Sequence, residues 1–184
     1  HIHNATRNNR TGSANDTIGQ DAIEKAFKDQ GINKTFKDIW VDWRDWIYTT
    51  YRDNITFTTN KVFNGAPLTE AGGLNEWGTD YEKIRINKTA LNVKGPYNIS
   101  FKGKHPISGS TNINYSISIF GRTGNTISKI AGLRFTGNTT FAFNSTADEI
   151  ILVKTQLNYV SNTDYELNFS RVNRPPNLTA IGNK

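Results

Sequence analysis

The chain has 184 residues, carries a formal net charge of +6 and contains no cysteine. The lack of cysteine excludes disulfides, cysteine-zinc sites and thiol catalysis together, and no run approaches the roughly 20 apolar residues of a membrane helix. The length suits one domain, or one domain with an appendage. Residues 1–15 are polar, begin with His1-Ile2-His3 like the remnant of a tag, and are expected to be disordered.

Residues 16–53 are predicted to form a helical hairpin that serves packing or assembly. The first helix is expected to begin at residue 16 or 17 and to end at Gly31. The second is expected to run from about Asn33 to Arg52. Its apolar positions recur at steps of three and four and mark one wide stripe: Phe36, Ile39, Trp40, Trp43, Trp46, Ile47 and Tyr51.

Three of the four tryptophans lie on this stripe. Such rings either stack on a sugar or nucleotide or pack against another element, and the second use is the more common at helical spacing. We therefore interpret Trp40, Trp43 and Trp46 as a surface that packs against the rest of the chain or against another subunit.

From residue 54 to residue 174 the hydrophobic period changes to two, which is typical of β-strands. Glycine, asparagine and proline close each short stretch. The predicted strands are Ile55–Thr59, Lys83–Asn87, Leu91–Val93, Tyr97–Lys102, Ile113–Phe120, Ile127–Arg134, Thr139–Phe143, Ile150–Leu157 and Tyr165–Val172. Many short strands of this kind predict a mainly β fold, an antiparallel β-sandwich or jelly roll preceded by the short helical segment. Residues 175–184 are expected to form a loose tail.

The polar faces of these strands, together with one loop, supply the candidate binding site. In Ile113–Phe120 small polar side chains alternate with apolar ones, and a polar row of this kind forms either a solvated surface or the floor of a shallow groove. Trp77 lies in a polar loop that contains glycine, where a ring is free to stack on a sugar. The candidate saccharide-binding residues are Trp77, Tyr81, Arg85, Asn114, Ser116, Arg134 and Gln156.

Signatures of catalysis, metal binding and nucleic-acid recognition are weak or absent. No phosphate loop, zinc-protease motif or calcium loop occurs, the basic residues are scattered, and we expect neither nucleic-acid nor membrane partners. Carboxylates do occur in pairs that a glycosidase could use: Glu70/Glu76, Asp80/Glu82 and Asp148/Glu149. We expect no enzyme activity and no required cofactor, with a glycan hydrolase as one alternative. No motif supports a structural calcium ion.

Asn-x-Ser/Thr sequons are frequent along the chain. They leave open a second alternative, a glycosylated viral or cell-surface structural protein. Several of the sequons, such as those at Asn98, Asn114 and Asn168, fall within predicted strands, where packing leaves little room for a glycan.

A resemblance to a known family is carried by one stretch and by the strands that follow it. The stretch is Tyr97-Asn98-Ile99-Ser100-Phe101-Lys102-Gly103-Lys104, and the strands are those at Ile113–Gly121, Ile150–Leu157 and Tyr165–Phe169. Over roughly residues 54–172 the chain is similar to the CBM4/9-like jelly-roll carbohydrate-binding modules. Similar modules occur in accessory baseplate proteins of lactococcal-type siphophages, where a helical segment commonly precedes the module. This chain lacks the family's usual entry strand and its closing Asp-Asn-Val.

The resemblance implies a non-catalytic carbohydrate-binding module of a phage baseplate or tail protein, which contributes to adhesion to the host. The implied partners are a cell-wall polysaccharide of the host, for which an anionic one would suit the positive charge, and other baseplate proteins through the helical segment. The implied location is the virion. The family's sugar-contacting residues vary, so the candidate site residues follow from the strand and loop pattern of this sequence and not from the resemblance.

Overall fold

The computed structural model describes residues 17–91, 95–104, 113–158 and 163–172. The start (1–15) and the tail (175–184), for which we predicted disorder and a loose conformation, lie outside these residues, as does most of the strand predicted at Leu91–Val93. The chain divides into two compact units, His1–Asn54 and Ile55–Lys184. None of the described helices is long and apolar enough to cross a membrane.

The first unit contains helix α2 (Thr17–Asp29), helix α3 (Phe36–Tyr51) and the short 3₁₀ turn η1 (Arg52–Asn54). Gly31 ends α2 as predicted. It adopts a φ of 73°, and the next amide, that of Ile32, donates to the carbonyl of Phe27 at 2.9 Å. This glycine-dependent cap satisfies a carbonyl that the end of the helix would otherwise leave free.

Helix α3 begins at Phe36, three residues later than predicted. The reason is a capping box in which the Thr35 hydroxyl accepts from the Asp38 amide while the Asp38 carboxylate accepts from the Thr35 amide at 2.7 Å. In addition, Glu24 on α2 accepts a hydrogen bond from the Phe36 amide at 2.6 Å. This bond ties the first turn of α3 to α2.

The aromatic stripe of α3 is not its buried face. Trp43 and Trp46 are 48% and 51% exposed, whereas Val41 and Tyr48 are buried. The buried positions follow the i, i+3, i+4, i+7 spacing from Val41. Trp43 lies two positions after Val41, which places them on nearly opposite sides of the helix. Trp43 and Trp46 are therefore not part of the buried face of α3, and their packing against the sandwich or against another subunit stays a prediction.

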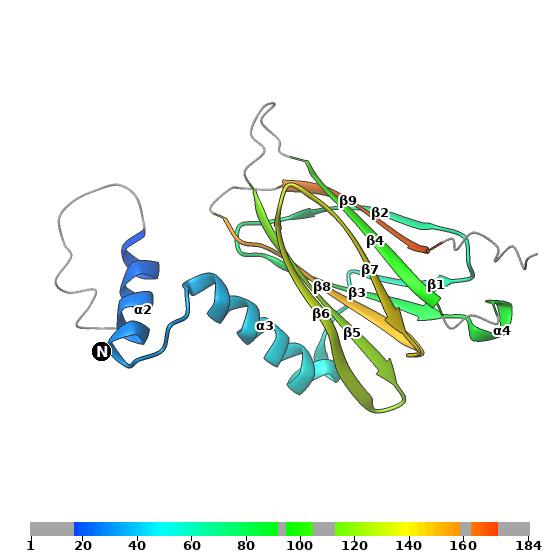
Figure 1. The fold of residues 1–184 in the computed structure, drawn as a ribbon, viewed down its shortest axis with the longest axis horizontal. Coiled ribbons are helices and arrows are strands. Elements are labelled where there is room, and N and C mark those ends of the chain that lie inside the picture. Colours follow the sequence, from blue (N-terminus) through cyan, green and yellow to red (C-terminus); the bar gives the residue numbers. More distant parts are fainter. Residues whose placement is uncertain (1–16, 92–94, 105–112, 159–162, 173–184) are drawn as a thin grey trace, which may run out of the picture. The chain divides into compact units, whose positions relative to one another are not determined.

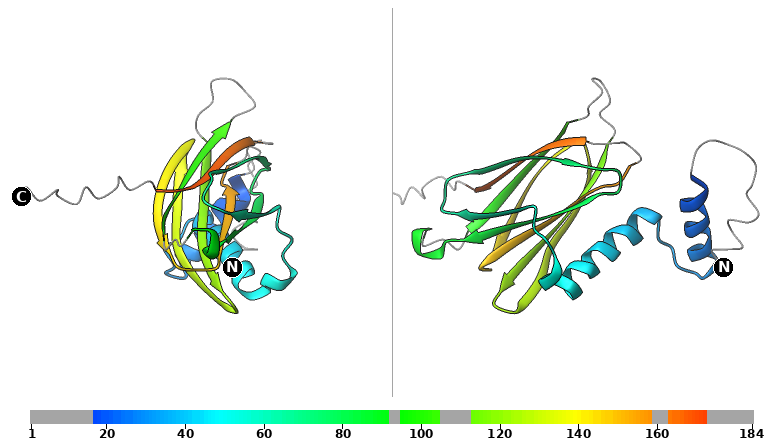
Figure 2. Two further views of the ribbon diagram at one scale, coloured as in Figure 1. Left: turned by 90° about the vertical axis from the view of Figure 1, so that its right-hand side faces the viewer. Right: turned by 180° about the vertical axis from the view of Figure 1, so that it is seen from behind.

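The second unit is mainly β, as predicted, and forms an antiparallel-dominated sandwich of two sheets (Figures 1 and 2). Its strands are β1 (Thr59–Phe63), β2 (Leu68–Leu74), β3 (Thr79–Ile86), β4 (Gly95–Lys104), β5 (Asn114–Thr123), β6 (Thr126–Thr136), β7 (Asn138–Ser145), β8 (Glu149–Gln156) and β9 (Thr163–Arg171), with one helical turn, α4 (Lys88–Leu91), after β3. One sheet has the order β1-β3-β8-β5-β6 and the other β2-β9-β4-β7. Among the described strands, only the edge strand β1 pairs in parallel, with β3.

Two strands differ from the prediction. The strand expected at Ile55–Thr59 instead begins where that range ends, as β1. Strand β2 was missed because its Gly72-Gly73 pair is typical of a turn. A glycine is needed at position 72 because the side chain of Tyr165, its cross-strand partner on β9, passes directly over it. A Cβ on Gly72 would lie 2.6 Å from the Tyr165 hydroxyl.

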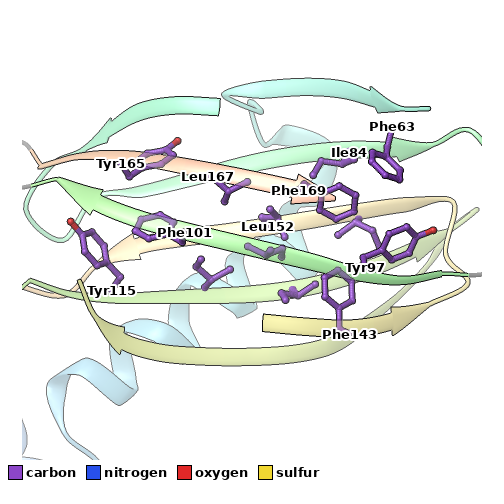
Figure 3. Close-up of a cluster of buried hydrophobic side chains, with 14 of the residues drawn as sticks. Phe63, Ile84, Tyr97, Phe101, Tyr115, Phe143, Leu152, Tyr165, Leu167 and Phe169 are labelled. Atoms are coloured by element: carbon purple, nitrogen blue, oxygen red, sulfur yellow. The ribbon is translucent and has the colours of Figure 1, made fainter. Parts of the chain in front are cut away.

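The core fills the space between the two sheets and is rich in aromatic rings (Figure 3). At one end Phe63, Tyr97, Phe143 and Phe169 are in contact, and their ring centroids lie 5.0–6.4 Å apart. At the other end lie three further rings: Phe101, Tyr115 and Tyr165. Each large aromatic side chain buries about 150–250 Å² of surface, so these rings supply a large share of the sandwich's stability.

Candidate functional site

The candidate site residues do not converge on one surface. Ser116 lies opposite Arg134 on β6 and opposite Thr155 on β8, so these three share the outer face of the five-stranded sheet. Gln156 lies opposite Tyr115 and therefore points to the inner face. It is fully buried there and accepts a hydrogen bond from the Thr163 hydroxyl at 2.6 Å. The predicted convergence is wrong for Gln156.

The serine row of β5 is not the floor of an open groove. Ser116 and Ser118 are 1% and 0% exposed. A ligand could not reach them without displacing what covers them, so the interpretation of Ser116 as part of an open site is wrong. A buried serine row and a solvated one have the same sequence pattern, because period-two alternation shows which residues share a face and not what covers that face.

Two other candidates lie near the ends of interior strands of this sheet. The side-chain oxygen of Asn114, at the start of β5, accepts a hydrogen bond from the Thr136 hydroxyl at 2.8 Å, and the Asn114 backbone amide donates to Asn158 Oδ1 at 2.6 Å. Arg85 is exposed on the outer face of β3, 3.7 Å from Glu149. Neither residue lies in the cleft described below.

Trp77 lies in the turn between β2 and β3, and Tyr81 lies on β3. The Gly78 amide donates to the Asn75 carbonyl at 2.8 Å and closes the turn, with Trp77 at a φ of 52°. A left-handed conformation costs a non-glycine residue about 1–2 kcal/mol. Both rings are half-buried and neither belongs to the central core.

One cleft of about 510 Å³ lies in the sandwich where the β5–β6 hairpin approaches β7. We call it the hairpin cleft. Its lining consists of small and uncharged residues: Gly95, Gly121, Thr123, Thr126, Ser128, Ile130, Asn144, Ser145, Thr146 and Ala147. Gly121 helps to keep the cleft open, since a Cβ at this position would lie 3.0 Å from the Cβ of Ala147 and 3.1 Å from Ile130.

Sequence reasoning missed the hairpin cleft. Its residues come from four separate stretches, and each stretch by itself is typical of a turn or a strand end. The available signal was a concentration of threonine, serine and asparagine around residues 123–128 and 144–146, and the same residue types are common in ordinary hairpin turns.

A second constellation is a cluster of charged side chains inside the sandwich, near strands β1, β2 and β3. Lys154 on β8 is 0% exposed, and its Nζ lies 3.2 Å from Glu82 Oε2 and 3.5 Å from Glu70 Oε1. Lys154 also donates to the Tyr165 hydroxyl, which donates in turn to Glu70 Oε1 at 3.3 Å. With Asp80, whose Oδ2 lies 3.4 Å from the Tyr165 hydroxyl, these residues form the lysine cluster.

The two glutamates of the cluster have pKa values shifted in opposite directions. Burial raises the pKa of Glu82 to about 7; the charge of Lys154 opposes this rise and the neighbouring Glu70 adds to it. Burial alone would also raise the pKa of Glu70, but hydrogen bonding with Glu82 and the charge of Lys154 lower it to about 2. Between about pH 2 and pH 7 the pair therefore holds one proton, on Glu82.

One of the carboxylate pairs expected from the sequence, Glu70/Glu76, is rearranged. Glu70 faces Glu82 across the two sheets, and it does not pair with Glu76. Glu82 is 1% exposed and Glu70 is 7% exposed, so a polysaccharide has no access to them of the kind that glycoside hydrolysis requires. Among the residues that the structure describes, no group of three or more His, Cys, Asp or Glu side chains is placed to hold a metal ion.

No protein-family model matches the chain, and no curated protein matches it. Among solved structures, the pre-peptidase C-terminal domain of a Bacillus anthracis collagenase is 15% identical, with a TM-score of 0.40 over 64% of this chain and 99% of that one. The Yersinia pseudotuberculosis-derived mitogen is 10% identical, with a TM-score of 0.37 over 61% and 92% of the two chains. The carbohydrate-binding module TmCBM61, solved with β-1,4-galactotriose, is 11% identical, with a TM-score of 0.33 over 55% and 68%.

Proposed function

We propose that this protein is a non-catalytic carbohydrate-binding module that holds an uncharged saccharide in the hairpin cleft and needs no cofactor to do so. The observation that carries the proposal is the lining of the cleft. Hydroxyl and amide side chains dominate it, and none of its lining residues is charged. Its volume lies within the range of about 300–1,000 Å³ that is common for small-molecule sites.

The chemistry of the lining suits the hydroxyl groups of a sugar. Threonine, serine and asparagine side chains both donate and accept hydrogen bonds, as sugar hydroxyls do. Ile130 supplies one apolar surface for the C–H face of a ring. A hydrogen bond contributes about 0.5–1.5 kcal/mol net, so a few of them give a dissociation constant on the order of 1 mM, as expected for a module that acts in several copies.

The setting that we propose for this binding is a phage baseplate or tail, with the host's cell-wall polysaccharide as the natural ligand and other baseplate proteins as partners of the helical unit. The support for this setting is the sequence resemblance over residues 54–172. The half-exposed rings of Trp43 and Trp46 on α3 are further support for a partner at the helical unit.

A glycan array followed by calorimetry with the best ligand tests the binding proposal. Asn144→Ala should weaken binding by about 2- to 10-fold, as loss of one hydrogen bond predicts. Thr140→Ala on the same strand, outside the cleft, is the matched control and should leave binding unchanged. If Trp77→Ala abolishes binding while Asn144→Ala does not change it, the cleft assignment is wrong and the site lies at the β2–β3 turn. Release of shorter sugars during incubation would overturn the non-catalytic assignment.

The salt dependence of binding separates the two candidate ligand types. Because none of the cleft's lining residues is charged, affinity should stay nearly constant from low to physiological salt. Exposed charges are screened over about 8–10 Å at these salt concentrations, so a steep fall in affinity would indicate an anionic polysaccharide held by the basic surface and not by the cleft.

A further inference from the structure

The lysine cluster is not used by the proposed saccharide site, and it is an unusual feature for a small β-sandwich. Lys154 is buried between the two sheets with no exposed atom. The charged and titratable groups that face it, or that contact its carboxylate partners, come from four other strands: Lys61 on β1, Glu70 on β2, Asp80 and Glu82 on β3, and Tyr165 on β9.

A buried ion pair is by itself a poor stabilising device. The cost of removing two charges from water often exceeds the attraction between them, and apolar residues of the same size do as well or better. The chain also has no cysteine and so no disulfide. A lysine placed against two carboxyl groups in a buried site offers a different means of cross-linking.

We propose that Lys154 and Glu82 become joined by an isopeptide bond, formed without any other enzyme, with Glu70 as the proton acceptor. A proton first leaves the Lys154 ammonium for the Glu70 carboxylate. The free Nζ then attacks the carboxyl carbon of Glu82, the C–N bond forms, and the C–OH bond breaks. The leaving hydroxyl takes the second amine proton and departs as water. The products are a neutral amide, a neutral Glu70 carboxyl group and one water molecule, so atoms and charge balance.

The geometry assigns these roles. Glu82 supplies the carboxylate oxygen nearest to Lys154 Nζ, at 3.2 Å against 3.5 Å for Glu70. The register explains this reach: Lys154 pairs with Asp80, so Glu82 lies two residues along the same face of the neighbouring strand, where diagonal side chains of this length meet. Tyr165 hydrogen-bonds to both Lys154 and Glu70 and provides a relay for the departing proton.

The protonation pattern of the pair supports the same assignment. Burial raises the pKa of Glu82, so this carboxyl group keeps its proton and can lose hydroxyl as water. The pKa of Glu70 is lowered despite its burial, and Thr59, which donates to Glu70 at 2.8 Å, helps to hold it ionised. Holding the reacting groups in contact in a site that excludes water favours condensation over hydrolysis.

The intact mass of the purified full-length chain tests this proposal directly. We expect a mass lower than the sequence mass by one water molecule, and a digest in which the peptides that contain Lys154 and Glu82 remain joined. Lys154→Arg should restore the sequence mass. The matched control, Lys83→Arg on β3, should keep the deficit. Glu70→Gln should reduce the joined fraction, with the circular dichroism spectrum showing that the variant is folded.

Two results would overturn the proposal. One is folded wild-type chain at the full sequence mass, with the Lys154 peptide released free after prolonged incubation. The other is a joined peptide in which fragmentation places the bond at Asp80 or Glu70, which would refute the assignment of Glu82. Since the primary readout is the wild-type mass, the proposal remains testable even if a variant fails to fold, and it stands or falls independently of saccharide binding.

Discussion

Replacing Gly72 by alanine tests how tightly Tyr165 is held. A Cβ at this position would lie 2.6 Å from the Tyr165 hydroxyl oxygen and 2.8 Å from its Cζ. The ring cannot easily move away, because it stacks on Phe101 at 5.3 Å and its hydroxyl hydrogen-bonds to Glu70 and Lys154. Overpacking of this kind costs about 1–3 kcal/mol, and we expect the upper end of that range because a buried hydrogen bond is also displaced.

Gly73→Ala is the matched control for this variant. Gly73 is the next residue of the same strand, and a Cβ there would meet only ordinary contacts, the closest being Asp164 at 3.7 Å. It should be neutral or stabilising by about 0.4–1 kcal/mol, since alanine restricts the unfolded chain. In thermal unfolding, Gly72→Ala should lower Tm by about 4–12 °C, while Gly73→Ala should not lower it. Equal Tm values for the two variants would show that Tyr165 yields freely and that the cluster around it is not fixed.

Three further outcomes are expected. In freshly translated chain, the isopeptide bond should form fastest below pH 7 and about tenfold more slowly per pH unit above it, as measured by mass spectrometry. The reason is that Glu82, whose pKa is raised to about 7 by burial, ionises above this pH. A rate of bond formation that increases through pH 8 would contradict this role of Glu82. Thr35→Ala should destabilise α3 by about 1 kcal/mol through loss of the capping box, seen as faster amide exchange in its first turn. Trp43→Ala should change the free energy of unfolding by less than about 1 kcal/mol, because the ring is half-exposed; a loss of 3 kcal/mol or more would show that an assembled partner buries it.

Much of the fold was predictable because β5 and its neighbours carry a clear period. The strand predicted at Ile113–Phe120 is β5, since alternation over eight residues leaves few other structures. In β8 the same reasoning does not show which residues point to the inner face of the sheet. Its first residues after Glu149 are apolar at every position, Ile150 to Val153, because both faces are buried, so the sequence does not show that Lys154 and Gln156 point inward.

The sites were less predictable than the fold, because they depend on the stacking of strands that are distant in sequence. Glu70 and Glu82 meet through the packing of β2 and β3, which belong to different sheets, and nothing local distinguishes this pair from Glu70 and Glu76. The hairpin cleft likewise needs the β5–β6 hairpin and the end of β7 to come together. Local patterns report the face of a strand and not its neighbour in the opposite sheet.

The position of Asn144 in the lining of the hairpin cleft has a consequence for how the protein is produced. Asn144 is exposed and begins the sequence Asn-Ser-Thr, an acceptor for N-linked glycosylation. A glycan attached there would occupy the volume that we assign to the ligand. Chain made by a glycosylating eukaryotic host should therefore fail to bind free sugar, and enzymatic removal of the glycan should restore binding. For this cleft, a role as a glycosylated surface and a role as a sugar-binding surface exclude each other.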